Sequence, residues 1–90
     1  MITNDERHKI EDATHRELCK SFAKHGDWEE MEYRDMFAVI SGELAEAVEA
    51  WSKNDHFGPH GMLIELAQVG ACCQKMAMQI LRRNRMPSCQ

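Results

Sequence analysis

The sequence has few of the features that stabilise a short chain by covalent or metal cross-links. Its four cysteines form no CxxC pair, since Cys72 and Cys73 are adjacent while Cys19 and Cys89 stand alone. Adjacent positions on a helix point about 100° apart, so these thiols are poorly placed to form a structural zinc site. The pattern predicts reduced cysteines, and it leaves burial against a second subunit as the way for 90 residues to gain stability.

The sequence also lacks segments that direct a chain to nucleic acid or to a membrane. The net charge is −4, and no block of Lys or Arg would follow a nucleic-acid backbone. No apolar run approaches the roughly 20 residues that span a bilayer, and positions 1–6 have neither the basic nor the apolar part of a signal peptide. We therefore expect a cytoplasmic protein that binds neither a nucleic-acid polymer nor a membrane.

Period-two alternation of apolar and polar residues is absent as well, which favours an all-α fold over one with half-buried strands. A first helix is expected from about Asn4 to Lys24, with Gly26 as its C-terminal cap. Its apolar stripe is thin and consists of Ile10, Thr14, Leu18 and Phe22.

A second helix is predicted to begin at Asp27, because a Glu at position 30 completes a typical N-terminal capping pattern. It is expected to run to about Ser52, with a break near Tyr33. One face of this helix is apolar at helical spacing. We expect the face to lie in the core, and it consists of Tyr33, Met36, Phe37, Ile40, Leu44, Ala47, Val48 and Trp51.

Turn-forming residues at positions 53–61 predict a chain reversal and therefore a helical hairpin. The third helix is expected over about Met62 to Arg83, followed by a flexible tail at 84–90. This helix is apolar nearly all round, so we expect a second subunit to cover part of it. The small residues that would allow close approach across that interface are Ala67, Gly70 and Ala71.

One narrow stripe of the third helix stays polar, and it consists of Glu65, Gln68, Cys72, Lys75, Gln79 and Arg82. Glu43 and Glu46 border the apolar face of the second helix. Neither they nor Glu65 has a Lys or Arg three or four positions away, although such pairs stabilise a helix by about 0.2 to 0.5 kcal/mol. In an antiparallel hairpin these carboxylates would repel one another unless a hard cation such as Mg²⁺ or Mn²⁺ lay between them. The alternative is that they extend separately into water.

The run from Gly42 to Ala50, followed after a loop by Glu65-Leu66-Ala67-Gln68, resembles the ExxE and ExxD pair of MazG-like nucleoside triphosphate pyrophosphohydrolases. The resemblance extends over about residues 22–81. It implies one helical domain over 1–90, completed as a four-helix-type bundle by forming a homodimer or a dimer of dimers. It also implies Mg²⁺-dependent hydrolysis of a nucleoside triphosphate to the monophosphate and pyrophosphate.

Carried over to this sequence, the motif makes Glu43, Glu46, Glu65 and Gln68 metal ligands, with Glu46 as the catalytic base. Gln68 stands where the motif has Asp, so the site has one charge fewer and is expected to bind metal more weakly. Lys75, Lys53 and Arg82 are the candidate phosphate contacts, although Lys and Arg near helix C-termini are also favoured by the helix dipole.

The competing hypothesis is a non-catalytic helical oligomer of the same kind that binds nucleotides or a partner protein. The amide at Gln68 is the feature that favours it.

Overall fold

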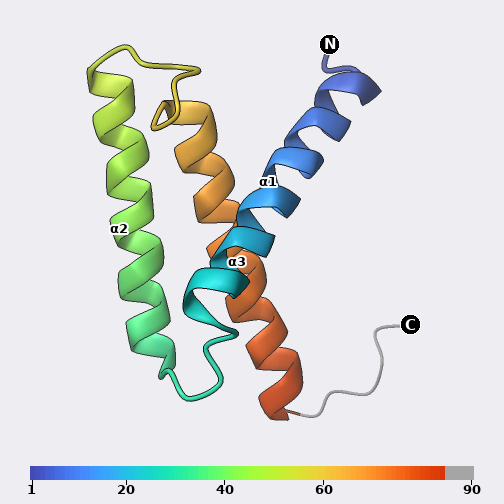
Figure 1. Cartoon of the computed structure of the whole chain (residues 1–90), viewed down its shortest axis with the longest axis vertical. Helices are drawn as coiled ribbons and strands as arrows, with labels where there is room; N and C mark the ends of the chain where they lie inside the picture. The colour runs from blue at the N-terminus through green and yellow to red at the C-terminus, as the bar shows by residue number, and fades with distance from the viewer. Residues whose placement is uncertain (85–90) are drawn as a thin grey trace.

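The computed structural model describes residues 1–84, which form three helices and no strand (Figure 1). They are α1 (Asn4–His25), α2 (Tyr33–Ser52) and α3 (Met62–Asn84). The all-α class is confirmed, as are the bounds of the first helix to within one residue and the C-terminal end of the second. Position 84, expected to begin a flexible tail, belongs to α3, and the rest of that tail lies outside the described residues.

The ends of α1 are set by local chemistry. The Thr3 side chain accepts a hydrogen bond from the backbone N–H of Glu6 at 3.1 Å, and the Glu6 carboxylate accepts from the Thr3 backbone at 2.9 Å. These reciprocal bonds satisfy amides that a helix start otherwise leaves unpaired. At the other end Gly26 adopts φ 67°, a conformation that glycine takes without steric cost.

The start predicted for the second helix is wrong. The Asp27 carboxylate accepts from the backbone N–H of Glu29 at 3.0 Å, which closes a turn instead of capping a helix. Trp28 has φ 67°, a left-handed conformation that a right-handed helix does not accommodate. The chain therefore forms a loop up to Tyr33, where α2 begins. The sequence predicts only a break in a longer helix at this residue.

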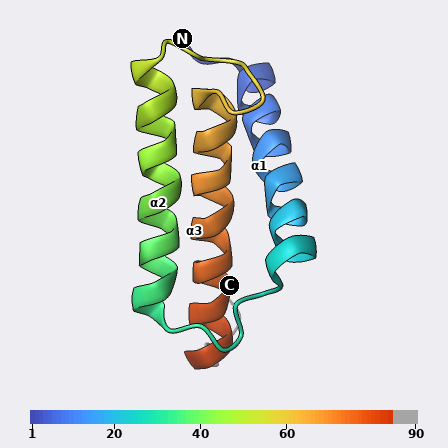
Figure 2. The same ribbon diagram turned by 60° about the vertical axis from the view of Figure 1, so that its left-hand side comes forward.

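The three helices are arranged with α3 between the other two. Figures 1 and 2 show α2 and α3 side by side and antiparallel, which confirms the predicted hairpin, while the C-terminal half of α1 crosses α3. Helix α1 packs against α3 and not against α2. No helix among residues 1–84 has the length and apolar character needed to cross a membrane.

The contact between α1 and α3 includes a series of polar interactions. The polar stripe predicted on α3 faces this contact, and Glu65, Cys72, Lys75 and Gln79 are buried. Three of its side chains donate to α1 or the loop after it: Gln68 to the Glu17 carboxylate, Lys75 to the Ser21 hydroxyl, and Gln79 to the Asp27 carbonyl. Arg83, rather than Arg82, continues the series by donating to carbonyls of the same loop.

The apolar core is small and lies toward the end of the hairpin where α2 begins. It consists of the buried residues Trp28, Met36, Cys72 and Met76. Met36 and Ala47 of the predicted apolar face of α2 are buried, as expected. The same prediction is wrong for its other side, because Phe37, Leu44, Val48 and Trp51 are 48 to 64% exposed. Only α3 packs on α2, so one chain covers one side of that face.

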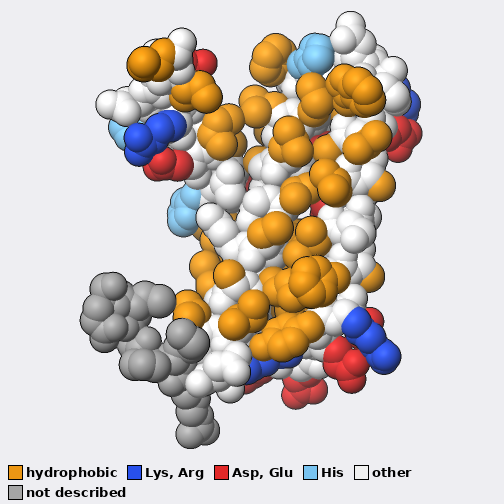
Figure 3. Space-filling view, turned by 180° about the vertical axis from the view of Figure 1, so that it is seen from behind, with side chains coloured by type: hydrophobic (Ala, Val, Ile, Leu, Met, Phe, Trp, Pro, Cys, Tyr) orange, Lys and Arg blue, Asp and Glu red, His pale blue; other side chains and the backbone are white. Residues whose placement is uncertain are grey.

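An exposed apolar face therefore extends over the α2–α3 hairpin (Figure 3). Helical spacing assigns to it Phe37, Leu44, Val48 and Trp51 of α2 with Leu66, Cys73, Ala77 and Ile80 of α3. The small residues predicted for a subunit interface lie elsewhere. Ala67 and Ala71 are buried within the chain, and a Cβ on Gly70 would lie 3.3 Å from the Thr14 side chain of α1.

Candidate metal centre

Three carboxylates meet where α2 lies beside the start of α3. Glu43 and Glu46 are three positions apart and so project from one side of α2, and Glu65 projects from the first turn of α3. One oxygen from each lies within 4.8 Å of the others. The structure thus brings together the three glutamates that the sequence analysis proposed as ligands.

The three glutamates differ in their exposure. Glu65 is 3% exposed, Glu43 is half-buried and Glu46 is exposed. The buried Oε2 atoms of Glu43 and Glu65 have no hydrogen-bond partner among the described residues. A buried polar atom without a partner is costly, and a buried negative charge more so.

The pKa values follow from this burial. Burial, then the hydrogen bond and charge of Glu46, then the charge of Glu43, raise the pKa of Glu65 to about 7, while His60 acts in the opposite direction. Burial also raises the pKa of Glu43, with smaller contributions from Glu46 and Glu17. Both carboxyl groups are therefore held in surroundings that disfavour their charged form.

Divalent cations with hard oxygen ligands fit this donor set. Mg²⁺ and Mn²⁺ take carboxylate oxygens, and a cation at this point would offset the burial and the mutual repulsion that raise the two pKa values. It would also give the unpartnered oxygens of Glu43 and Glu65 something to bind. The residues present therefore fit a divalent ion, held by Glu43, Glu46 and Glu65.

Gln68 makes a contact that the sequence analysis did not anticipate. Its Nε2 donates to Oε1 of Glu17 at 3.1 Å, and Glu17 is only 9% exposed. The other Glu17 oxygen pairs with the exposed ammonium of Lys20 at 3.2 Å. Glu17 was missed because it lies on another helix, 51 positions away. The available signal for its burial was its position next to Leu18, which belongs to the thin apolar stripe of α1.

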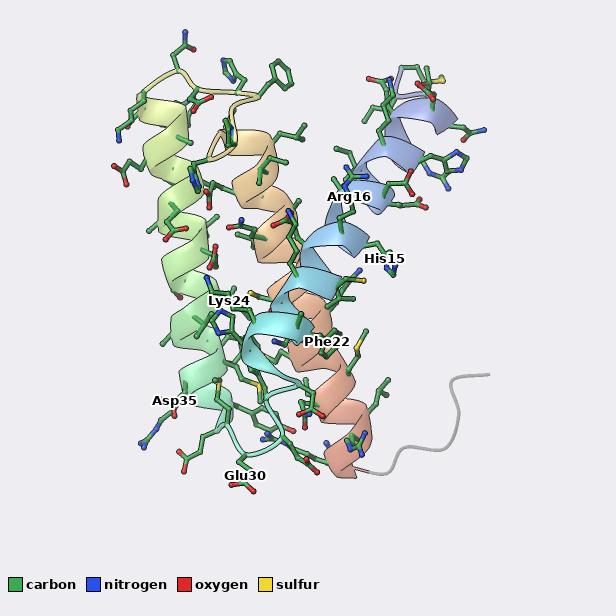
Figure 4. The ribbon with its side chains drawn as sticks, viewed as in Figure 1. His15, Arg16, Phe22, Lys24, Glu30 and Asp35 are labelled. Carbon is green, nitrogen blue, oxygen red and sulfur yellow. The ribbon has the colours of Figure 1, made fainter. Side chains whose placement is uncertain are left out.

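A cavity of about 470 Å³ opens beside these residues, between α1 and the hairpin. Glu43, Glu17 and Gln68 line one part of it. Basic and aromatic side chains also line it: Lys20, Lys24, His25 and Trp28. Figure 4 shows Lys24 extending from the last turn of α1 toward α2, whereas Phe22 lies over α3. Acidic and basic groups therefore share one cavity.

A second cavity of about 450 Å³ lies by the hairpin loop. Glu46, Glu65 and Gln68 line it, together with Glu49, Lys53, Asp55 and His60. The His60 Nδ1 is 3.7 Å from Oε1 of Glu65. Gln68 lines both cavities, while Glu43 lines the first and Glu46 and Glu65 line the second.

The predicted phosphate contacts are dispersed. Lys75 is 1% exposed and donates to the Ser21 hydroxyl at 2.9 Å. Lys53 pairs with Glu49 at 2.9 Å and lines the second cavity. Arg82 is exposed, and 17 residues of helix place it roughly 25 Å along α3 from Glu65. Of the three, only Lys53 shares a cavity with the carboxylates.

No protein-family model matches the chain, and no curated protein or solved structure is significantly similar to it. The MazG-like resemblance therefore stays a hypothesis that depends on the motif residues. Because function belongs to sites more than to folds, the three carboxylates and their two cavities are the basis on which a function is proposed.

Proposed function

We propose that this chain is a Mg²⁺- or Mn²⁺-dependent hydrolase that cleaves a nucleoside triphosphate to the monophosphate and pyrophosphate. The observation that carries the proposal is the meeting of three carboxylates within 4.8 Å, two of them with a buried oxygen that lacks a partner. The MazG-like motif suggests the substrate class. The 470 Å³ cavity has a volume typical of small-molecule sites.

A divalent ion bound here would supply Lewis-acid polarisation of the phosphate oxygens. Glu43 and Glu65, the more buried carboxylates, are assigned to holding it. Glu46 is exposed and so is open to solvent, which favours it as the base that accepts a proton from the attacking water. The water oxygen bonds to the α-phosphorus as the bond to the leaving pyrophosphate breaks.

The negative charge of a triphosphate requires cations close to the carboxylates. Lys20 and Lys24 of α1 share the first cavity with Glu43, and Lys53 shares the second with Glu46. We assign the phosphate contacts to these lysines. Lys75 is 1% exposed and lines neither cavity, so its role is assigned to the packing of α1 on α3 through its bond to Ser21.

The proposed enzyme is a homodimer or a dimer of dimers, formed through the exposed apolar face. Contiguous apolar surface of this kind marks a protein interaction site in soluble proteins. Two α2–α3 hairpins paired through it would form a four-helix bundle, in which the outward side chains of α2 and α3 become core. The apolar character of α3 on two sides is then accounted for.

The test is release of pyrophosphate from a panel of nucleoside triphosphates with and without Mg²⁺. Glu46→Gln is expected to lower turnover on the order of 100-fold or more, because it removes the proposed base. Glu65→Gln is expected to raise the Mg²⁺ concentration needed for half-maximal turnover, because it removes the charge of a proposed ligand. Glu30→Gln, an exposed position on the loop before α2, is the matched control and should leave turnover unchanged.

A non-catalytic oligomer is the second candidate, and the amide at Gln68 favours it because the motif has a carboxylate there. Absence of turnover on every nucleotide, together with absence of Mg²⁺-dependent nucleotide binding, would establish that candidate and exclude the hydrolase. Nucleotide binding without turnover would identify a binding module.

A further inference from the structure

The amide of Gln68 is oriented by the first helix. Because its Nε2 donates to Glu17, the amide oxygen is the end that remains free, and oxygen is the atom that coordinates a hard cation. Glu17 is nine-tenths buried and makes this bond from a different helix, so the contact orders Gln68 only when α1 is packed on α3.

Glu17 also places a fourth negative charge beside the cluster. It lines the same cavity as Glu43 and Gln68, and only 9% of it is exposed there. Glu65 is only 3% exposed, and its Oε2 has no partner among the described residues. A cation bound by the cluster would therefore offset its negative charge and coordinate the unpartnered oxygen.

From these contacts we infer that Glu17 is a positioning residue of the metal centre: it orients the Gln68 oxygen and supplies, from α1, the charge that Gln68 itself lacks. This inference rests on the metal site of the proposed function. It explains how an amide can stand in the acidic motif, since the hydrogen-bonded pair of Gln68 and Glu17 together carries the charge of one carboxylate. It also makes the packing of α1 a requirement for tight metal binding.

The experiment is a titration of the full chain with Mn²⁺, in which electron paramagnetic resonance measures the free ion. Glu17→Gln keeps the size of the side chain and removes its charge. Loss of a group that supports a metal ligand typically weakens binding 10- to 100-fold, and we expect an effect on the order of 10-fold here. Glu11→Gln, an exposed change of the same charge on α1, is the matched control and should leave the affinity unchanged.

The reversed pair, Glu17→Gln with Gln68→Glu, gives the decisive comparison because both side chains keep their length. The amide at position 17 can donate to the new carboxylate, so the hydrogen bond is kept while the charge moves from α1 to α3. We expect this double variant to recover the Mn²⁺ affinity of the original chain. Recovery also supports the inference if Glu17→Gln alone fails to fold, as judged by its helical circular dichroism.

The two proposals fail in different ways. If the original chain binds no Mn²⁺, the metal site itself is excluded and this inference with it. If the original chain binds Mn²⁺ and Glu17→Gln binds it as tightly as Glu11→Gln does, the metal site stands and the role of Glu17 is refuted. Failure of the reversed pair to recover affinity refutes that role as well.

Discussion

The ammonium group of Lys75 lies 4.5 Å from the centre of the Trp28 ring and 5.3 Å from that of Phe22. It also donates to the Ser21 hydroxyl at 2.9 Å. Burial lowers the pKa of this amine, which is the direction expected when a charge leaves water. Lys75 thus connects α3 to α1 and to the loop that follows it, and its long alkyl stem fills the space between them.

Lys75→Ala is expected to cost about 2 to 4 kcal/mol in the free energy of unfolding, because it leaves a cavity where the stem was packed. Lys75→Met keeps most of that volume and is expected to stay within about 1.5 kcal/mol of the original chain. Denaturant unfolding monitored by helical circular dichroism measures both. Lys24→Ala and Lys24→Met, at an exposed position, are controls whose free energies of unfolding should differ little from each other. Equal losses for the two Lys75 variants would contradict the packing role.

The raised pKa of Glu65 predicts a pH dependence of stability. Its pKa is about 7 in the folded chain, against 4.5 for the ordinary group, so the folded state binds a proton more tightly than the unfolded state does. The stabilisation is complete below pH 4.5 and is lost as the pH rises through about 7. Without metal, we expect the free energy of unfolding to fall by on the order of 3 kcal/mol across this range.

Glu65→Gln, which does not titrate, should lose much less stability over the same pH range. At pH about 8, excess Mg²⁺ should restore the free energy of unfolding of the original chain, because the ion binds the charged cluster of the folded state. It should have little effect on the stability of the variant. Parallel pH curves for the two chains, or the same response to Mg²⁺, would contradict the assignment of Glu65 to the centre.

The hairpin loop should tolerate no side chain at Gly61. A Cβ there would lie 2.6 Å from the backbone nitrogen of Gly58 and 2.8 Å from a carboxylate oxygen of Asp55, and the latter residue accepts a hydrogen bond from the start of α3. Gly61→Ala is expected to cost about 1 to 3 kcal/mol in unfolding free energy. It should also weaken Mn²⁺ binding, because Glu65 lies in the turn of α3 that this loop holds.

Gly42 provides the matched comparison for Gly61. It lies within α2, where a Cβ would have no atom within 4 Å, so Gly42→Ala should stabilise the helix by about 0.5 to 1 kcal/mol. The midpoint temperature of thermal unfolding should therefore rise for Gly42→Ala and fall for Gly61→Ala. A Gly61→Ala chain as stable as the original would show that the loop rearranges freely.

The exposed apolar face predicts that a charge at its centre prevents dimer formation. Leu44 is 48% exposed in the single chain, and Leu44→Lys would bury a lysine if that face is the subunit interface. We expect a dimer for the original chain and a monomer for the variant by sedimentation velocity. Ala38→Lys adds the same charge about 120° away around α2 and should leave the dimer intact. A monomeric original chain would contradict the interface.

Much of the fold follows from local features of the sequence. The capping pattern around Thr3, the glycine at position 26 and the turn formers of the hairpin loop act over a few residues, so the helix ends they set are predictable. The same holds for Glu43 and Glu46, whose spacing alone puts them on one side of a helix. Residues at a fixed distance along one helix need no tertiary information to be placed together.

Predictions that depended on what a helix packs against were less successful. Helical periodicity identified the apolar side of α2 and the polar stripe of α3, but periodicity does not say which side turns inward. In the structure α1 packs over the polar stripe, and Leu44 and Trp51 are left exposed. Trp28, whose left-handed conformation lies in the loop before α2, has its ring beside the Lys75 ammonium, a contact between segments far apart in the chain.

By itself, therefore, the sequence determined the helical class, the hairpin and the acidic residues available on the side of its loop, because each of these arises from interactions between near neighbours in the chain. Only the tertiary structure decided that Glu17 joins Gln68 and that basic residues of α1 share a cavity with Glu43. Those contacts join helices separated by tens of residues, and their energies depend on how the helices pack, which no local pattern encodes.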